Sequence, residues 1–201
     1  MTNVHNAPGP WRTNRGNVRH IATALAAAML FATGVAAAQG RYIRAEENAN
    51  HDLVITTSAR ERIVVGKSNR KWADQKQSEF KDIAISRDGT AVGWVAYYPN
   101  CCTSYPVPIL VEVYTAGQRH TFQPTIAPWH WCFVDGAARI AAISATVHGP
   151  QNEVIELWDV STGTRRGEFA WMDGETYPGA PAWVTAVRDA RASKTHDCAS
   201  Q

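Results

Sequence analysis

Tight-turn signals between short runs of β-branched and aromatic residues are the feature that most constrains this chain. Asp-Gly pairs stand at 88–89 and 135–136, and further turn glycines stand at 117 and 163. Such residues supply the positive φ that short hairpin turns require. The two Asp-Gly pairs are 47 positions apart and the two later glycines are 46 apart, so the spacing predicts that a unit of four short strands occurs twice.

The strands expected from this pattern place the chain in the all-β class. The two four-strand units cover residues 82–86, 91–98, 109–114 and 119–122, and then 129–134, 139–146, 153–159 and 165–170. A hairpin of 53–57 and 62–65 precedes them, and a last strand is expected at 183–187.

These elements predict a single all-β domain over residues 52–190. We expect two four-stranded antiparallel, blade-like sheets with the extra N-terminal hairpin and the C-terminal strand. Residues 39–51 are polar and unpatterned, which predicts a flexible lead-in, and residues 191–201 are expected to form a C-terminal tail.

Two segments resemble strands of WD40-type or TolB-like β-propeller repeats. They are SRDGTAVGW at 86–94 and ELWDVSTG at 156–163, and the resemblance covers roughly residues 80–170. Propellers close with four or more blades, whereas this chain holds two full units and two fragments. The resemblance therefore implies a partial propeller, a β-sandwich of two blade-like sheets, or part of a ring that other copies complete.

Residues 1–38 have the order of features that a secretory signal has. Arg12, Arg15 and Arg19 precede an apolar run from Ile21 to Val35, which ends in three alanines at 36–38. An uncleaved anchor is the alternative, but a run of about 18 residues is marginal for a membrane span. We therefore expect cleavage before Gln39, no membrane span afterwards, and a periplasmic or secreted mature protein.

The mature chain is close to neutral once this signal is removed. Three of the 20 Lys and Arg residues leave with residues 1–38 and none of the 18 acids does, so 17 basic residues face 18 acidic ones. A near-neutral chain gives no electrostatic reason to expect nucleic acid as a partner.

Four cysteines in an exported chain predict two disulfides, formed by Cys101, Cys102, Cys132 and Cys198. Because a ring closed by adjacent cysteines is strained, we expect Cys101 or Cys102 to pair with Cys132. Cys198 would then take the remaining partner or stay free.

A soft-metal site is the alternative use of these thiols. Its candidate ligands are Cys101, Cys102, His130, Cys132 and His148, of which His130 and Cys132 share one face of an expected strand. No C-x-x-C or H-x-x-x-H pair supports this site, and a disulfide would consume the thiols. We therefore expect no metal or other cofactor.

The longer connections gather at one end of the expected blades, opposite the tight turns. They span 99–108, 123–131, 148–152 and 171–181. Long loops on a rigid scaffold often carry binding residues, and aromatic side chains are common anchors in interfaces. The binding residues expected from this pattern are Tyr105, Trp129, His148, Trp171 and Tyr177.

The sequence contains no motif that identifies an enzyme. G-x-S-x-G, H-E-x-x-H and phosphate-binding glycine loops are absent from it, and we expect no catalytic residue. The function expected is a non-enzymatic binding module whose loop-rich end engages a protein, a peptide or an envelope glycan. A Cys/His metal or redox protein is the first alternative, and a small hydrolase is the second.

Overall fold

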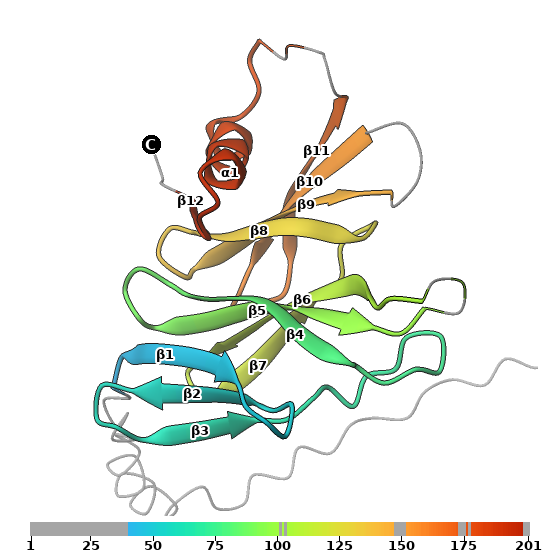
Figure 1. Ribbon diagram of the computed structural model, residues 1–201. Coiled ribbons are helices and arrows are strands. Elements are labelled where there is room, and N and C mark those ends of the chain that lie inside the picture. Colours follow the sequence, from blue (N-terminus) through green and yellow to red (C-terminus); the bar gives the residue numbers. More distant parts are fainter. Residues whose placement is uncertain are drawn as a thin grey trace, which may run out of the picture. The chain divides into compact units, whose positions relative to one another are not determined.

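The computed structural model describes residues 40–100, 102, 104–146, 152–172, 176 and 178–198, which belong to one compact unit. Residues 1–38, where the signal is expected, lie outside the described residues. The described part contains a three-stranded, a four-stranded and a five-stranded sheet (Figure 1). The expected all-β class is confirmed.

The sheets follow one another along the chain. The three-stranded sheet contains β1 (Tyr42–Glu47), β2 (Leu53–Thr57) and β3 (Arg62–Val65). The four-stranded sheet contains β4 (Glu79–Ile85), β5 (Ala91–Tyr98), β6 (Val107–Thr115) and β7 (Gln118–Phe122). The five-stranded sheet, in the order β11-β10-β9-β8-β12, contains β8 (Pro128–Val134), β9 (Arg139–Ala145), β10 (Asn152–Asp159), β11 (Arg165–Met172) and β12 (Asp197–Cys198).

Strands that are neighbours in both the sheet and the sequence are antiparallel, and tight turns join β4 to β5, β6 to β7 and β8 to β9. In the β8–β9 turn, Asp135 has a φ of 55° and Gly136 has a φ of 74°. In the β6–β7 turn, Ala116 and Gly117 have φ values of 49° and 77°. The backbone at these turns is therefore left-handed, as the Asp-Gly and Gly signals predict.

The three sheets and one helix form successive layers with a cluster of buried side chains between each pair. Residues of β1–β3, among them Leu53 and Ile55, pack against Trp94 and Tyr98 of β5. The opposite face of the four-stranded sheet packs against β8–β10, where Trp131 is fully buried. The far face of the five-stranded sheet is covered by the helix α1 (Ala182–Ala192).

Helix α1 replaces the strand expected at 183–187, so that prediction is wrong. The buried residues of α1 are Val184, Val187 and Ala190, a spacing of three that places them on one side of a helix. The β-branched residues Val184, Thr185 and Val187 made the segment resemble a strand, but docking on the sheet buries the helical stripe. The sequence does not reveal this neighbouring sheet face.

The two segments expected to be irregular also contain strands. Residues 42–47 form β1, which pairs with β2, so the expected hairpin is a three-stranded sheet. The lead-in was expected to be flexible because β1 exposes polar side chains, although Tyr42 is only 4% exposed. In the expected tail, α1 continues to Ala192, and β12 pairs with β8 in parallel.

The disulfide pairing differs from the one expected. Cys132 on β8 pairs with Cys198 on β12, 66 positions away, because the parallel pairing of these strands brings the two side chains together. Cys102 is also disulfide-bonded, and Cys101 lies outside the described residues. Among the described residues, no helix has the length and apolar character needed to cross a membrane.

Candidate functional site

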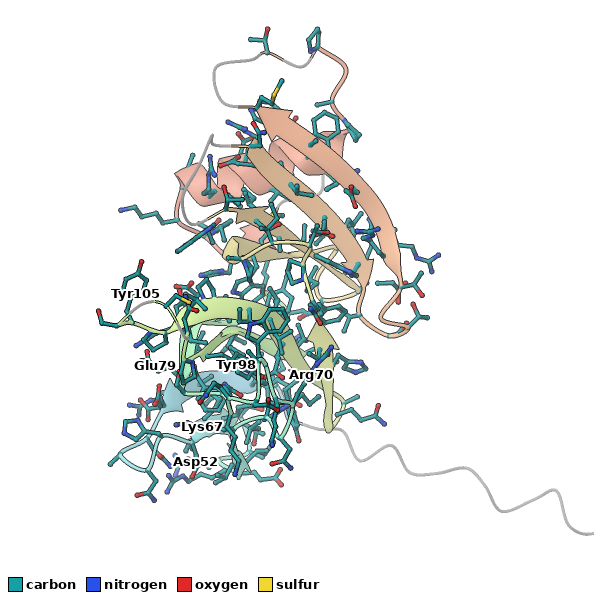
Figure 2. The ribbon with its side chains drawn as sticks, turned by 90° about the vertical axis from the view of Figure 1, so that its right-hand side faces the viewer. Asp52, Lys67, Arg70, Glu79, Tyr98 and Tyr105 are labelled. Carbon is teal, nitrogen blue, oxygen red and sulfur yellow. A yellow bond between two sulfur atoms is a disulfide. The ribbon has the colours of Figure 1, made fainter. Side chains whose placement is uncertain are left out.

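Alternation of strand direction places six connections at one end of the stacked sheets. They follow β1, β3, β5, β7, β9 and β11, and we call this end the loop end. Figure 1 shows it on the right, and Figure 2 is turned so that it faces the viewer. The opposite end carries the tight turns, so the expected asymmetry between the two ends is present in the fold.

Exposed apolar side chains concentrate at the loop end. The described residues include six large hydrophobic side chains that are exposed: Ile43, Val64, Trp72, Tyr105, Trp129 and Met172. Five of them, all except Ile43, belong to loop-end connections or to strand ends that adjoin them. Large apolar side chains that remain in water at one end of a domain are typical of a surface that binds a partner.

Tyr105 and Trp129 are the two expected binding residues that lie open to solvent. Tyr105, in the β5–β6 connection, is 49% exposed, and Trp129, near the start of β8, is 44% exposed. The Trp129 indole Nε1 donates a hydrogen bond to the carbonyl oxygen of Ala145 at 3.0 Å. A register shift between Pro128 and His130 places Trp129 at a bulge, and the bond to Ala145 fixes the orientation of its ring.

Trp171 is half-buried and contributes to packing under α1. The Arg188 guanidinium lies 3.7 Å from the centre of the Trp171 ring. The centre of the Phe169 ring lies 6.1 Å from the centre of the same Trp171 ring. Arg188 also contacts the buried carboxylate of Glu153, so it links α1 to β10 and β11. His148 and Tyr177, the remaining expected binding residues, lie outside the described residues.

A polar groove lies at the loop end between the first two sheets. Its volume is about 560 Å³, and it is lined by the β1–β2 connection, the 66–78 connection and the start of β4. The lining residues are Glu47, Asn48, His51, Lys67, Ser78, Glu79 and Lys81. Sequence reasoning missed this groove because its residues are ordinary surface types and because β1, which supplies one wall, was expected to be flexible.

Ion pairs organise part of the groove. His51 Nδ1 lies 2.7 Å from a Glu47 oxygen, and Lys81 Nζ lies 2.8 Å from a Glu79 oxygen. The hydrogen bond that Lys81 donates to Glu79 raises the pKa of Lys81 above its usual value. Lys67 forms no ion pair with a residue of the described part, so it is the charged side chain of the groove that has no ion-pair or hydrogen-bond partner there.

Two buried carboxylates anchor the region beneath the loop end. Glu156 on β10 accepts hydrogen bonds from the backbone and hydroxyl of Thr125, both at 2.9 Å, and from Arg165 at 2.8 Å. Glu112 on β6 accepts one from the Trp94 indole at 2.8 Å, and burial raises the pKa of Glu112. Because Thr125 belongs to the connection between β7 and β8, Glu156 holds that connection in place. Sequence reasoning missed both glutamates.

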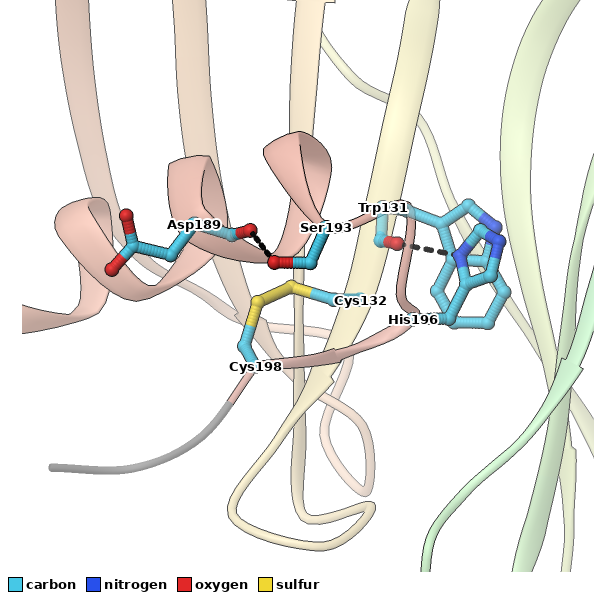
Figure 3. The surroundings of a disulfide bond; sticks show 6 residues. All are labelled: Trp131, Cys132, Asp189, Ser193, His196 and Cys198. Atoms are coloured by element: carbon cyan, nitrogen blue, oxygen red, sulfur yellow. Dashed lines mark hydrogen bonds between the residues drawn. A yellow bond between two sulfur atoms is a disulfide. The ribbon is translucent and has the colours of Figure 1, made fainter.

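The candidate metal ligands do not form a metal site in the described part of the chain. Cys132 is consumed by its disulfide with Cys198 (Figure 3), and Cys102 is disulfide-bonded as well. No group of three or more His, Cys, Asp or Glu side chains converges among the described residues. The other two candidates, Cys101 and His148, lie outside them.

His130, the remaining candidate ligand, stacks instead on another histidine. The rings of His130 and His196 lie 5.4 Å apart and nearly parallel, and His196 Nδ1 lies 2.8 Å from the carbonyl oxygen of Trp131. That oxygen can only accept, so Nδ1 of His196 carries the hydrogen. Burial, with further contributions from His196 and Arg191, lowers the pKa of His130 to about 4.

Comparisons with known proteins give one weak structural likeness. No family model matches the sequence, and no curated protein matches it. The fold is similar to a solved chain described as Kuenenia stuttgartiensis hydrazine synthase, with a TM-score of 0.36 and 16% sequence identity. The match covers 63% of this chain and 33% of that chain, so this chain spans about a third of its length. Similarity at this level does not assign the chain to a family.

Proposed function

We propose that this protein is an exported, non-enzymatic binding module whose loop end binds a protein or peptide segment. The observation that carries the proposal is the position of the exposed apolar side chains. Five of the six in the described residues lie at the loop end, beside a polar groove. An apolar surface with polar neighbours is the usual composition of a protein-binding site.

The scaffold beneath the loop end is suited to this role. The strands that flank Tyr105 and the strand that carries Trp129 contribute to buried clusters, and Thr125 is hydrogen-bonded to a buried carboxylate. Binding residues on a rigid scaffold lose little conformational entropy when a partner docks. The Cys132–Cys198 disulfide supports export to an oxidising compartment.

We also infer that the four-stranded sheet and strands β8–β11 are two copies of one propeller-like unit. Across β6 and β7, Tyr114 pairs with Arg119, two positions after the buried Glu112. Across β10 and β11, Trp158 pairs with Arg165, two positions after the buried Glu156. The same order of carboxylate, aromatic residue and cross-strand arginine supports a duplicated unit.

A double substitution tests the binding function. Tyr105→Ala with Trp129→Ala removes the two exposed aromatic side chains from the loop end while leaving the buried clusters intact. We expect partners recovered by cross-linking from the exported fraction, and quantified by mass spectrometry, to fall at least tenfold, because truncation of an interface anchor costs ~2 kcal/mol. The melting temperature should change little, since neither side chain is buried.

Ile43→Ala is the control for this experiment. It also removes an exposed apolar side chain, but from the start of β1, away from the loop end, and should leave the recovered partners unchanged. Equal losses in the control and the double variant would contradict the proposal, because they would indicate adhesion that depends on apolar exposure alone.

A further inference from the structure

The groove at the loop end has the size of a ligand site, and no Phe, Tyr or Trp side chain of the described residues lines it. Its volume of about 560 Å³ is lined by two lysines, two glutamates, one histidine, one asparagine and one serine. Ligand pockets commonly measure ~300–1,000 Å³. Figure 2 shows Lys67 and Glu79 of the groove on the same face as Tyr105. The groove is therefore a separate, ionic part of the loop end.

The hydrogen bonds of Asn48 determine which of its groups remains available. Its Oδ1 accepts hydrogen bonds from the backbone amides of Asn50, at 2.8 Å, and Asp52, at 3.0 Å. The oxygen is therefore hydrogen-bonded within the β1–β2 connection. The side-chain NH₂ group, which carries two donors, takes no part in these two hydrogen bonds. Asn48 thus adds hydrogen-bond donors to a groove that already contains the ammonium of Lys67.

The two carboxylates of the groove are each occupied by a cationic or ring-nitrogen partner. Glu79 holds Lys81, and Glu47 holds His51. Lys67 has no such partner in the described residues, so an incoming ligand gains most by placing an anion against it. An ammonium with neighbouring N–H donors is a suitable environment for a carboxylate, which accepts hydrogen bonds only.

We propose that the groove binds a carboxylate group of an acidic peptide segment, with Lys67 as its counter-ion and Asn48 as a hydrogen-bond donor. This inference rests on the proposed function and specifies the chemistry of the partner. A neutral glycan is the less suitable ligand, because sugars bind largely by stacking on aromatic faces and the groove offers ionised side chains instead. The apolar residues Tyr105 and Trp129 would contact other parts of the same partner.

Titration of the mature chain with short peptides tests the inference by amide NMR. The probes are acetylated, amidated tetraglutamate, the matching tetralysine, and chitotetraose as a neutral glycan. We expect tetraglutamate to shift the amide signals around Asn48, Lys67 and Ser78, and Lys67→Gln to weaken its binding by up to about fivefold, which is the range for an exposed ion pair. Raising the salt concentration should weaken binding further.

Lys71→Gln is the control, because Lys71 is exposed in the same 66–78 connection but does not line the groove. Its tetraglutamate affinity should match that of the unsubstituted chain. Equal weakening in both variants would overturn the inference, since it would indicate general attraction to positive charge. A groove that responds to tetralysine or chitotetraose and not to tetraglutamate would overturn it as well.

The two proposals can fail separately. If the groove does not bind tetraglutamate but Tyr105→Ala with Trp129→Ala still lowers partner recovery, only the inference about the groove is contradicted. If the groove binds tetraglutamate but the double substitution leaves partner recovery unchanged, the proposed function is contradicted. Thermal melting of each variant confirms that it is folded.

Discussion

His130 is a buried side chain whose protonation opposes folding. It is 8% exposed, and its Nε2 has no hydrogen-bond partner in the described part of the chain. Its neighbours include the ring of His196 and the guanidinium of Arg191, both of which disfavour a second positive charge. Folding therefore requires the neutral imidazole.

The depressed pKa of His130 predicts that the protein loses stability in mild acid. An unfolded chain protonates a histidine near pH 6.5, whereas the folded protein does so near pH 4. Between these values the unfolded state binds more protons, so the free energy of unfolding falls as the pH decreases, by up to about 3 kcal/mol from this group. Urea denaturation at several pH values measures the slope, and His130→Gln should flatten it between pH 6.5 and 4.

His51→Gln is the control for the acid effect, because it removes a histidine with an exposed ring. Comparison of the two variants separates the effect of the buried imidazole from that of removing any histidine. A slope in His130→Gln equal to that of the unsubstituted chain would show that carboxylates, and not this imidazole, control the acid sensitivity.

The residues of the candidate site differ in how far the sequence could predict them. Tyr105 was predictable as an exposed aromatic residue because prolines flank its segment and no strand pattern includes it. Trp129 and Trp171 both lie at strand ends that adjoin loop-end connections, yet one is open and the other lies under Arg188. That difference depends on α1, whose position over the sheet no local pattern encodes. Lys67 and Asn48 become a site only through the pairing of β1 with β2.

Strands were predictable at the level of elements, whereas the last helix was not. In β4–β11 the runs of β-branched and aromatic residues and the positive-φ turns agree with each other, so local signals suffice. For α1, the β-branched composition favoured a strand. The segment is a helix because the helical conformation buries its apolar side against the five-stranded sheet. The pairing of Cys132 with Cys198 depends on the path of the chain through α1 to β12, which the spacing of the cysteines does not encode.

The Cys132–Cys198 disulfide fixes the C-terminal element to the sheet. Strand β12 contributes only two residues, which is too short to be held by backbone hydrogen bonds alone. Cys132→Ala with Cys198→Ala should lower the free energy of unfolding by roughly 2–4 kcal/mol, because a crosslink over 66 positions restricts the unfolded chain. Urea denaturation without reductant measures this loss.

A local change should accompany the loss of that disulfide. Hydrogen exchange at Phe133, whose amide bonds to the carbonyl oxygen of His196, should accelerate more than exchange on β5. A stability change below about 1 kcal/mol with unchanged exchange at Phe133 would contradict the role given to the disulfide.

The whole molecule depends on how closely its sheets can approach each other. Gly93 on β5 faces Trp131 on β8, and a Cβ atom at Gly93 would lie 2.3 Å from the Trp131 ring. The indole has little freedom to move, because its Nε1 donates to the carbonyl oxygen of Asp82 and the Phe133 ring packs against it edge-on. A glycine here allows two layers to pack around a buried tryptophan.

Gly93→Ala should therefore destabilise the entire stack of layers. We expect a loss of about 3 kcal/mol in the free energy of unfolding, because overpacking a filled core forces side chains and backbone apart. Gly66→Ala is the matched control: the nearest atom to its added Cβ is Asp52 Oδ1 at 3.8 Å, and its cost should be below about 0.5 kcal/mol. Trp131→Phe in the Gly93→Ala background should recover at least about 1 kcal/mol relative to the sum of the single changes. Additive single effects would mean that the indole does not set the spacing between the sheets, and then the stacking of the layers would need another cause.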